Sequence, residues 1–333
     1  MSRRMVVAIA VMTIVLGGFV SSGWAADTIN MGFYSIAPSF APPVAAIEKM
    51  KETLEKETNG AIQMKLYPAG QLGPESAGLN AIKIGTVQTA SFSSVSISTV
   101  APEANALMMP FVLNTWEDVE KIVHGPSMAK IGQTLESKGF KLLGVGSYGF
   151  FTVLSKKGLI NSLNDMKGLK IRVYPTPVLV DLYKLLGASP TPLAFPEIFT
   201  GLQQGVIEAT DGTLDSSHAS KQYEVAKFLT ETNHLHGFHF YVANKAWFSK
   251  LAPEMQELIA RRFKEYIDLE LKMSREYEDQ IREIYKKEGV QFKTLSDKER
   301  EDFKASTRPI HDQFRSSIGE AFMTQFYSET GYK

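Results

Sequence analysis

Hydrophobic and polar residues along the chain repeat alternately with the period of a strand and the period of a helix. Strand-like alternation covers residues 28–33, 62–67 and 87–92, whereas helical spacing covers 38–57 and 79–84. Strands that alternate with helices of this kind indicate α/β units whose sheets are mostly parallel. We therefore predict an α/β unit in this part of the chain.

A similar group of elements follows later. The pattern predicts strands over 169–173 and 189–193 and helices over 178–186 and 197–204. Two such groups indicate two α/β lobes, each close to the usual size of a domain. Because no flexible linker, repeat or low-complexity tract separates them, we expect several short crossings between the lobes.

The stretch from Pro253 to Gly289 predicts one long helix. Its apolar residues recur at spacings of three and four, Pro253 suits the first helical turn, and Gly289 suits the end. Such a helix is about 54 Å long at ~1.5 Å per residue, which exceeds one small domain. We predict that it crosses both lobes. A coiled coil is the weaker alternative, since no heptad seam is sustained.

The first 25 residues have the order of a secretory signal peptide. Ser2-Arg3-Arg4 is followed by an uncharged apolar run from Met5 to Val20, and small residues precede a cleavage point between Ala25 and Ala26. A membrane anchor is the alternative, but this run is short for a span of about 20 residues. We expect export, cleavage and a soluble periplasmic protein.

Composition excludes several classes of protein. The chain has 36 basic and 36 acidic residues and no cysteine. The charge balance gives no reason to expect nucleic acid or an anionic membrane surface as a partner. The absence of cysteine excludes a disulfide scaffold, cysteine zinc sites, a cysteine nucleophile and a cysteine-anchored lipoprotein.

Two sequence motifs give only weak evidence for a dinucleotide site and a metal site. Residues 144–149 match G-x-G-x-x-G, but a strand-like run over 150–154 follows, where a dinucleotide site needs a helix. His234, His236 and His239 are close in sequence but lack acids at matching spacing, so a metal site is the weaker interpretation. We expect one of them, His236, to line a polar cleft. The chain has no G-x-S-x-G, H-E-x-x-H or Walker motif, and we expect no cofactor.

Arg172 is the best candidate for ligand binding on physical grounds. It lies in a predicted strand that Tyr174-Pro175 ends, and α/β sheets bind ligands at the carboxyl ends of strands. Its planar guanidinium fits a carboxylate or a sulfonate. The alternative is an arginine that reaches solvent or pairs with a nearby acid. Phe195 also follows a strand, and its alternative is core packing.

Several segments together resemble one family. They are residues 164–173 (NDMKGLKIRV), 186–192 (LGASPTP), 195–208 (FPEIFTGLQQGVIE), 67–73 with Glu75, and 107–111 (LMMPF). These segments resemble the solute-binding proteins of TRAP (tripartite ATP-independent periplasmic) transporters of the DctP kind. The resemblance covers nearly the whole chain after the signal peptide.

The resemblance implies a type II-like, Venus-flytrap α/β fold whose two lobes close on an organic acid. It implies lobe I over 26–149 and 238–277, and lobe II over 150–237 and 278–333. The loaded protein would dock on a membrane permease made of a small and a large subunit. We expect a monomer, with a dimer through the long helix left open.

The resemblance also implies roles for individual residues. Arg172 falls on the arginine that pairs with the ligand's acid group, and Phe195 falls on the aromatic position that stacks on the ligand. Four residues fall on cleft-facing positions of the first lobe: Tyr34, Glu75, Ser93 and Ser94.

Two departures from the family pattern restrict the ligand. Gly212 stands where the family often has an asparagine, and Thr152 stands where some members have a second arginine. No arginine lies between Arg4 and Arg172. One guanidinium favours a monoanion, either a carboxylate or a small sulfonate, over a doubly charged acid. Asp211 completes the candidate ligand-binding positions.

Two other functions compete with capture for transport. A secreted, lyase-like enzyme would need an acid–base pair near Arg172, for which Asp211, Glu75 and the histidines are the candidates. A ligand-sensing subunit of a signalling system would share the same cleft. We predict a binding protein that carries out no chemistry.

Overall fold

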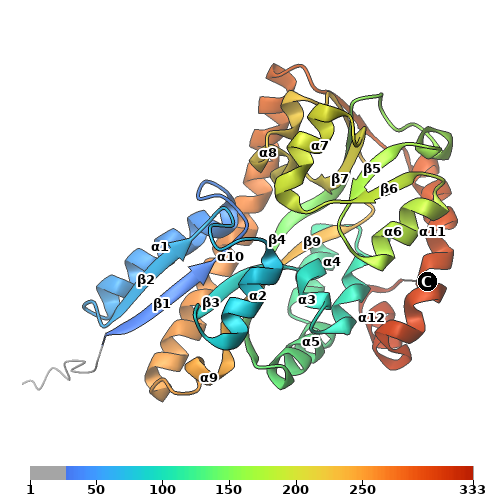
Figure 1. The fold of residues 1–333 in the computed structure, drawn as a ribbon. Helices are drawn as coiled ribbons and strands as arrows, with labels where there is room; N and C mark the ends of the chain where they lie inside the picture. Colours follow the sequence, from blue (N-terminus) through green and yellow to red (C-terminus); the bar gives the residue numbers. More distant parts are fainter. Residues whose placement is uncertain (1–27, 333) are drawn as a thin grey trace, which may run out of the picture.

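The computed structural model describes residues 28–332, so the predicted signal peptide lies outside the described part. Within this part, ten strands form a sheet in two halves that helices cover (Figure 1). The main path runs β2 (Ile62–Tyr67), β1 (Ile29–Tyr34), β3 (Thr89–Ser93), β9 (His236–Asn244), β4 (Phe140–Ser155), β7 (Ala209–Thr213), β5 (Lys170–Val173) and β6 (Ser189–Pro192). Beside it, β8 (Phe228–Glu231) pairs with β4 and with β10 (Gln291–Thr294).

The parallel α/β units predicted from the pattern are confirmed. In the first half β1 pairs in parallel with β2 and β3, and in the second half β5 pairs in parallel with β6 and β7. The long strands β4 and β9 run antiparallel to each other and join the halves. Residues 140–150 of β4 pair with β9, whereas residues 151–155 pair with β7 and β8.

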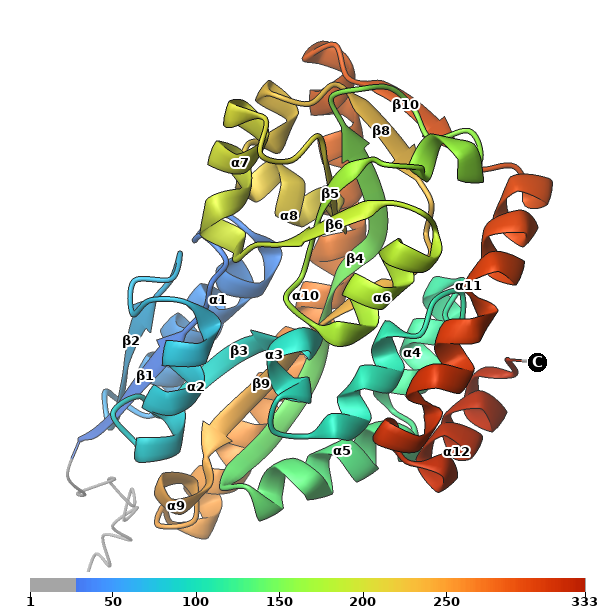
Figure 2. The same ribbon diagram turned by 45° about the vertical axis from the view of Figure 1, so that its right-hand side comes forward.

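The helices lie on both faces of the two halves (Figures 1 and 2). They are α1 (Pro42–Glu57), α2 (Glu75–Ile84), α3 (Ser94–Ser98), α4 (Trp116–Val123), α5 (Pro126–Ser137), α6 (Pro177–Leu185), α7 (Ile198–Gln204), α8 (Leu214–Ala219), α9 (Lys245–Phe248), α10 (Pro253–Lys287), α11 (Asp297–Ile318) and α12 (Glu320–Thr330). Short 3₁₀ turns include η1 (Pro102–Met108) and η3 (Phe195–Glu197). No helix of residues 28–332 is both long enough and apolar enough to cross a membrane.

Helix ends follow local chemistry. The first helix begins at Pro42, four residues later than predicted, because prolines occupy its first positions, where no N–H partner is needed. The second begins at Glu75, four residues earlier than predicted, and Gly85 ends it in the left-handed conformation (φ 80°). The serine-rich stretch after β3 forms a short helix that the Ser93 side chain caps.

The long helix predicted over residues 253–289 is present as α10 and crosses both halves of the sheet (Figure 1). Near its start, Phe263 packs into a core formed with α1 and β2. Near its end, Ile281 and Tyr285 pack into the core of the second half. One helix therefore contributes to the cores of both halves, whereas the exact lobe boundaries remain a prediction.

The G-x-G-x-x-G motif lies within β4, where α10 packs on it. A Cβ atom at these three glycines would overlap side chains of the helix. In order along the chain, Gly144, Gly146 and Gly149 face Ile267, Glu270 and Glu278. The Ser274 hydroxyl donates to the Ser147 carbonyl between them (2.9 Å). The motif thus provides a close-packing surface for the helix rather than a turn for a dinucleotide.

A methyl group at Gly146 should therefore destabilise the protein. We expect Gly146→Ala to lower the free energy of unfolding by about 1–3 kcal/mol, since its Cβ would overlap the Glu270 carboxylate. Gly158→Ala is the matched control, because a Cβ there meets nothing within 4 Å. Urea denaturation measures both. Glu270→Ala should recover part of the loss in the double variant. Equal stability of the two alanine variants would contradict this packing.

Candidate functional site

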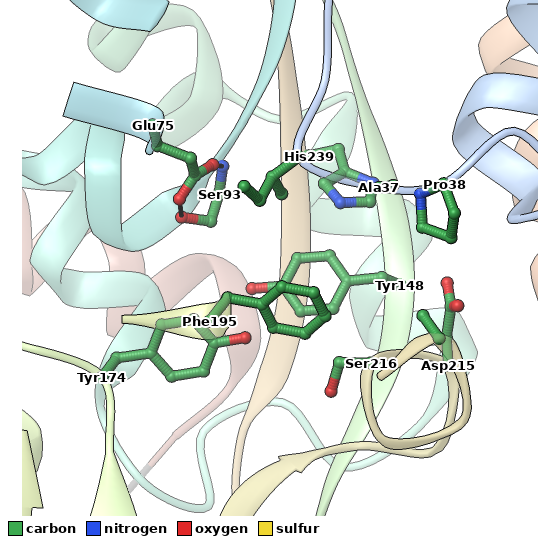
Figure 3. A pocket seen from close by; sticks show the side chains of 12 residues that line it. Ala37, Pro38, Glu75, Ser93, Tyr148, Tyr174, Phe195, Asp215, Ser216 and His239 are labelled. Carbon is green, nitrogen blue, oxygen red and sulfur yellow. Dashed lines mark hydrogen bonds between the residues drawn. The ribbon is translucent and has the colours of Figure 1, made fainter. Parts of the chain in front are cut away.

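A cleft lies between the two halves, and Figure 3 shows one part of it. It has two connected compartments that share four lining residues: Ile36, Glu75, Tyr174 and Phe195. The larger one, about 230 Å³, is lined by Arg172 and is called here the arginine compartment. The smaller one, about 60 Å³, is lined by His239 and is called the histidine compartment.

Arg172 is buried at the carboxyl end of β5, as the strand-end rule predicted. Its Nε donates to the Leu193 carbonyl (3.0 Å) and its Nη1 to the Asp211 carbonyl (3.3 Å). The guanidinium also lies 4.1 Å from the centre of the Tyr174 ring. Burial lowers the pKa of Arg172, but a guanidinium stays charged at neutral pH. Within residues 28–332 its Nη2 donates to no carbonyl or carboxylate, so this group remains for the acid group of a ligand in the cleft.

Phe195 lies at the start of η3 and lines both compartments. Glu197 holds this turn, since its carboxylate accepts from the Ala194 N–H (2.8 Å). Figure 3 shows the Phe195 ring beside Tyr174 and Tyr148 at the centre of the cleft. The ring is therefore placed to cover the apolar part of a ligand.

Glu75 is held rigidly at the opposite wall. Its carboxylate accepts from the Ser93 N–H (2.6 Å), the Ser93 hydroxyl (2.7 Å) and the Ser96 hydroxyl (2.7 Å). Glu75 begins α2 and Ser93 caps α3, so two helix starts fix this group. Four of the expected residues, Arg172, Phe195, Glu75 and Ser93, therefore line the same cleft.

Two first-lobe candidates lie beside the cleft without lining it. The Tyr34 hydroxyl donates to the Gly73 carbonyl (2.9 Å), and its ring packs against Phe92. Ser94 is buried in the first turn of α3. Both support the wall that carries Glu75.

Three other candidates lie behind Arg172. Thr152 donates to the Gly212 carbonyl (3.0 Å) across the β4–β7 pairing. The buried Asp211 carboxylate lies 3.5 Å from Nε2 of His234. Burial raises the pKa of Asp211 to about 7, although Arg172 opposes the change, and burial lowers the pKa of His234 to about 3. These side chains support the arginine rather than face the cleft.

The structure points to His239 as the cleft histidine instead of His236. The His236 ring packs against Trp116 and Phe150, and its Nε2 lies 2.7 Å from the Ser147 hydroxyl. His239 lies on the opposite face of β9 and lines the histidine compartment. Alternation separates the two histidines, as expected, but the sequence does not say which face meets the cleft. No group of three His, Asp or Glu side chains in residues 28–332 could hold a metal ion.

Among the polar residues that line the histidine compartment, sequence reasoning missed Tyr148, Tyr174, Asp215 and Ser216. Tyr174 directly follows β5, and Asp215 lies two residues after β7, in the first turn of α8. The strand-end rule applied to every strand would have drawn attention to both places. Tyr148 is hidden inside the glycine motif. Its buried hydroxyl has no hydrogen-bond partner within residues 28–332.

The wall behind the histidine compartment contains buried acids. His239 Nδ1 lies 3.3 Å from the Glu270 carboxylate, and Glu278 lies 3.5 Å from Arg282. Burial raises the pKa of Asp215 and of Glu278 to about 7 and also raises that of Glu270. Near neutral pH these buried carboxyl groups therefore hold protons in the folded state more strongly than they do in the unfolded chain.

The family model for bacterial extracellular solute-binding proteins, family 7 (DctP), matches residues 33–317. The chain belongs to this family. The resemblance to DctP-type TRAP solute-binding proteins is thus confirmed, and with it the two-lobed α/β fold class.

Two curated relatives of this DctP-family protein match along nearly their whole length. The 2,3-diketo-L-gulonate-binding periplasmic protein YiaO of Escherichia coli is 29% identical over 304 residues, which cover 91% of this chain and 92% of that one. The sialic acid-binding periplasmic protein SiaP of Vibrio cholerae is 25% identical, covering 96% and 97%.

Solved structures agree with the fold. A TRAP periplasmic solute-binding protein from Xanthobacter autotrophicus with bound β-D-galacturonate has a TM-score of 0.85 and 27% identity, covering 91% of this chain and all of that one. A TRAP protein from Ochrobactrum anthropi, whose C-terminus is bound in its ligand pocket, has a TM-score of 0.84 and 27% identity, covering 92% and 95%.

The buried acids of this DctP-family protein predict a specific pH dependence. Glu278 has its folded-state pKa raised from 4.5 to about 7, so the folded state keeps this proton where the unfolded state loses it. Its contribution of about 3 kcal/mol is present at low pH and is lost as pH rises from about 4.5 through 7. We expect Glu278→Gln to lose less stability than the wild type between these pH values.

Denaturant unfolding at both pH values measures this difference. Glu276→Gln is the control, because Glu276 is exposed on the same helix. It should keep the wild-type dependence on pH. A Glu278→Gln variant with the same pH dependence as the wild type would show that Glu278 ionises normally in the folded protein.

Proposed function

We propose that this protein is the periplasmic solute-binding component of a TRAP transporter and that it captures a small organic monoanion, a carboxylate, in the cleft. The observation that carries the proposal is the buried Arg172 guanidinium, which lines the cleft and whose Nη2 has no carboxylate or carbonyl partner within residues 28–332. A buried cation gains most from an acceptor of opposite charge.

The charges around the cleft support a monoanion. Arg172 is the only Lys or Arg among the residues that line the two compartments, whereas Glu75 and Asp215 are acids that line them as well. A second acid group on the ligand would face these carboxylates. Carboxylate is favoured over sulfonate because the two relatives are named for binding 2,3-diketo-L-gulonate and sialic acid, and the Xanthobacter autotrophicus structure holds β-D-galacturonate.

The two walls of the cleft support capture by closure. Glu75 and Ser93 come from the first half of the sheet, and Arg172, Phe195 and Asp215 come from the second. A ligand that contacts both walls binds the closed state more tightly than the open one, and this difference drives closure. The closed protein would then deliver its ligand to the small and large permease subunits, which the family implies.

The site gives little support to the enzyme alternative. Of the acid–base candidates near Arg172, Asp211 lies behind the arginine, and Glu75 is already bound by three donors. Of the three histidines only His239 lines the cleft, in the compartment that Arg172 does not line. A binding protein needs a rigid hydrogen-bond acceptor rather than a proton-transfer group on the wall of the cleft that carries Glu75. The three hydrogen bonds to Glu75 hold its carboxylate in that way. We therefore infer that the protein is not an enzyme.

Replacing the arginine should remove ligand binding. Removing one partner of a buried charge pair costs about 2–5 kcal/mol, so Arg172→Ala should weaken binding by about 30-fold or more. Protein refolded from denaturant, to release any co-purified ligand, is titrated calorimetrically with D-galacturonate, D-gluconate, 2,3-diketo-L-gulonate and 2-hydroxyethanesulfonate. Arg308→Ala, an exposed site on α11, is the control and should bind as the wild type does.

A carboxylate that binds Arg172→Ala with wild-type affinity would refute the arginine-centred site. If the wild type binds only the sulfonate, the preference for carboxylate is wrong, and loss of that binding in Arg172→Ala still supports the arginine-centred site. A thermal-shift screen gives a quick first pass, because ligand at about 1,000 times Kd stabilises by roughly 4 kcal/mol.

A further inference from the structure

We propose that Asp215 and His239 form a second recognition site within the cleft, which binds a hydrogen-bond donor, an ammonium or a hydroxyl group, on the part of the ligand away from its acid group. This inference rests on the proposed function. It adds a requirement on ligand chemistry and names Asp215 as the residue that imposes it.

The first observation is a buried carboxylate without a partner. Asp215 is 7% exposed and lines the histidine compartment, and its carboxylate forms no hydrogen bond or salt bridge with a residue of 28–332. Figure 3 shows its carboxylate at the side of the compartment below Pro38. Glu75, across the cleft, has three donors. A buried polar group without a partner is costly, so a donor from outside the chain would satisfy it.

The second observation is the pairing of the neighbouring charges. Asp215 is faced by His239 of β9 and by Glu270 and Glu278 of α10. His239 lies 3.3 Å from Glu270, and Arg282 lies 3.5 Å from Glu278. Each neighbouring acid thus has a partner of its own, and Asp215 does not. Its surroundings favour a positive or hydrogen-donating group.

The third observation is that the compartment has further unused hydrogen-bonding capacity. The Tyr148 ring lies 4.5 Å from that of His239, while its hydroxyl points away from Asp215 toward Tyr174 (Figure 3). His239 uses Nδ1 toward Glu270, which leaves Nε2 for another group. A donor that binds Asp215 would therefore find one further group in the compartment, Nε2 of His239, able to complete its hydrogen bonds.

The two compartments share part of their lining, so a single ligand can occupy both. Arg172 lines one and Asp215 lines the other, while Glu75, Tyr174 and Phe195 line both. A ligand with its carboxylate on Arg172 can pass beneath Phe195 and present its other end to Asp215. The cleft thus places a fixed positive charge and an unpaired acid at different ends of one space, which fits an amino acid-like or hydroxylated carboxylate better than a plain one.

Matched probes test this requirement. Refolded, ligand-free protein is titrated by calorimetry with hexanoate, 6-hydroxyhexanoate and 6-aminohexanoate, and with the butanoate, 4-hydroxybutanoate and 4-aminobutanoate trio. Within at least one trio, we expect a donor-bearing acid to bind at least about tenfold more tightly than the plain acid. Tighter binding of the amine than of the alcohol identifies an ammonium ligand, and the reverse order identifies a hydroxyl ligand.

Variants assign the effect to Asp215. Asp215→Asn keeps a carbonyl acceptor but no charge, so it should abolish the advantage of the amine and keep part of the advantage of the alcohol. Asp215→Leu should abolish both while the plain acid still binds. Asp279→Asn, an exposed acid on α10, is the control and should change nothing. Circular dichroism checks folding, and Asp215→Asn alone decides the test if the leucine variant is unfolded.

The outcomes separate this inference from the proposed function. If all members of both trios bind with equal affinity, or if both Asp215 variants keep the donor advantage, the second site is refuted while the arginine site stands. If no acid binds the wild type, or if Arg172→Ala binds all six as the wild type does, the proposed function fails and the second site fails with it.

Discussion

The close packing of α10 on β4 is the contact on which the rest of the structure depends. The helix lies against three glycine positions of the strand and contributes side chains to the cores of both halves. Larger residues at these glycines would hold the helix away from the strand. The same strand pairs with β9 in one half and with β7 and β8 in the other. The position of each cleft wall is therefore set by one helix and one strand.

Hydrogen bonds within each wall explain why charged groups can be buried at the cleft. Arg172 is held by backbone carbonyls of Leu193 and Asp211, which supply partial charge without neutralising it. A full carboxylate partner would have consumed the positive charge that a ligand needs. On the opposite wall, Glu75 is saturated with donors and so keeps its position without a cation. Both groups are fixed before any ligand arrives, and this reduces the entropy lost on binding.

Sequence reasoning predicted the parts that depend on local pattern. The strand at 62–67, the long helix and the strand-end position of Arg172 follow from periodicity and from proline and glycine positions. The family resemblance added Glu75 and Ser93. No local sequence pattern shows that these two residues lie on the cleft wall opposite Arg172. Periodicity could not choose His239 over His236, because alternation separates faces without saying which face meets the cleft. It also missed Asp215, since its unpaired state depends on the partners of Glu270 and Glu278 on a distant helix.

The two ends of the cleft differ in a way that couples ligand binding to protons. Behind Arg172, Asp211 has a pKa raised to about 7, and the same value holds for Asp215 in the other compartment. An anion bound at Arg172 adds negative charge near Asp211 and favours its protonated form. A donor bound at Asp215 acts in the opposite direction and favours its ionised form. A ligand that carries both groups shifts the two carboxyls in opposite directions, so its net proton uptake can be small. An acid that carries only the first group favours proton uptake at Asp211 without the opposite effect at Asp215.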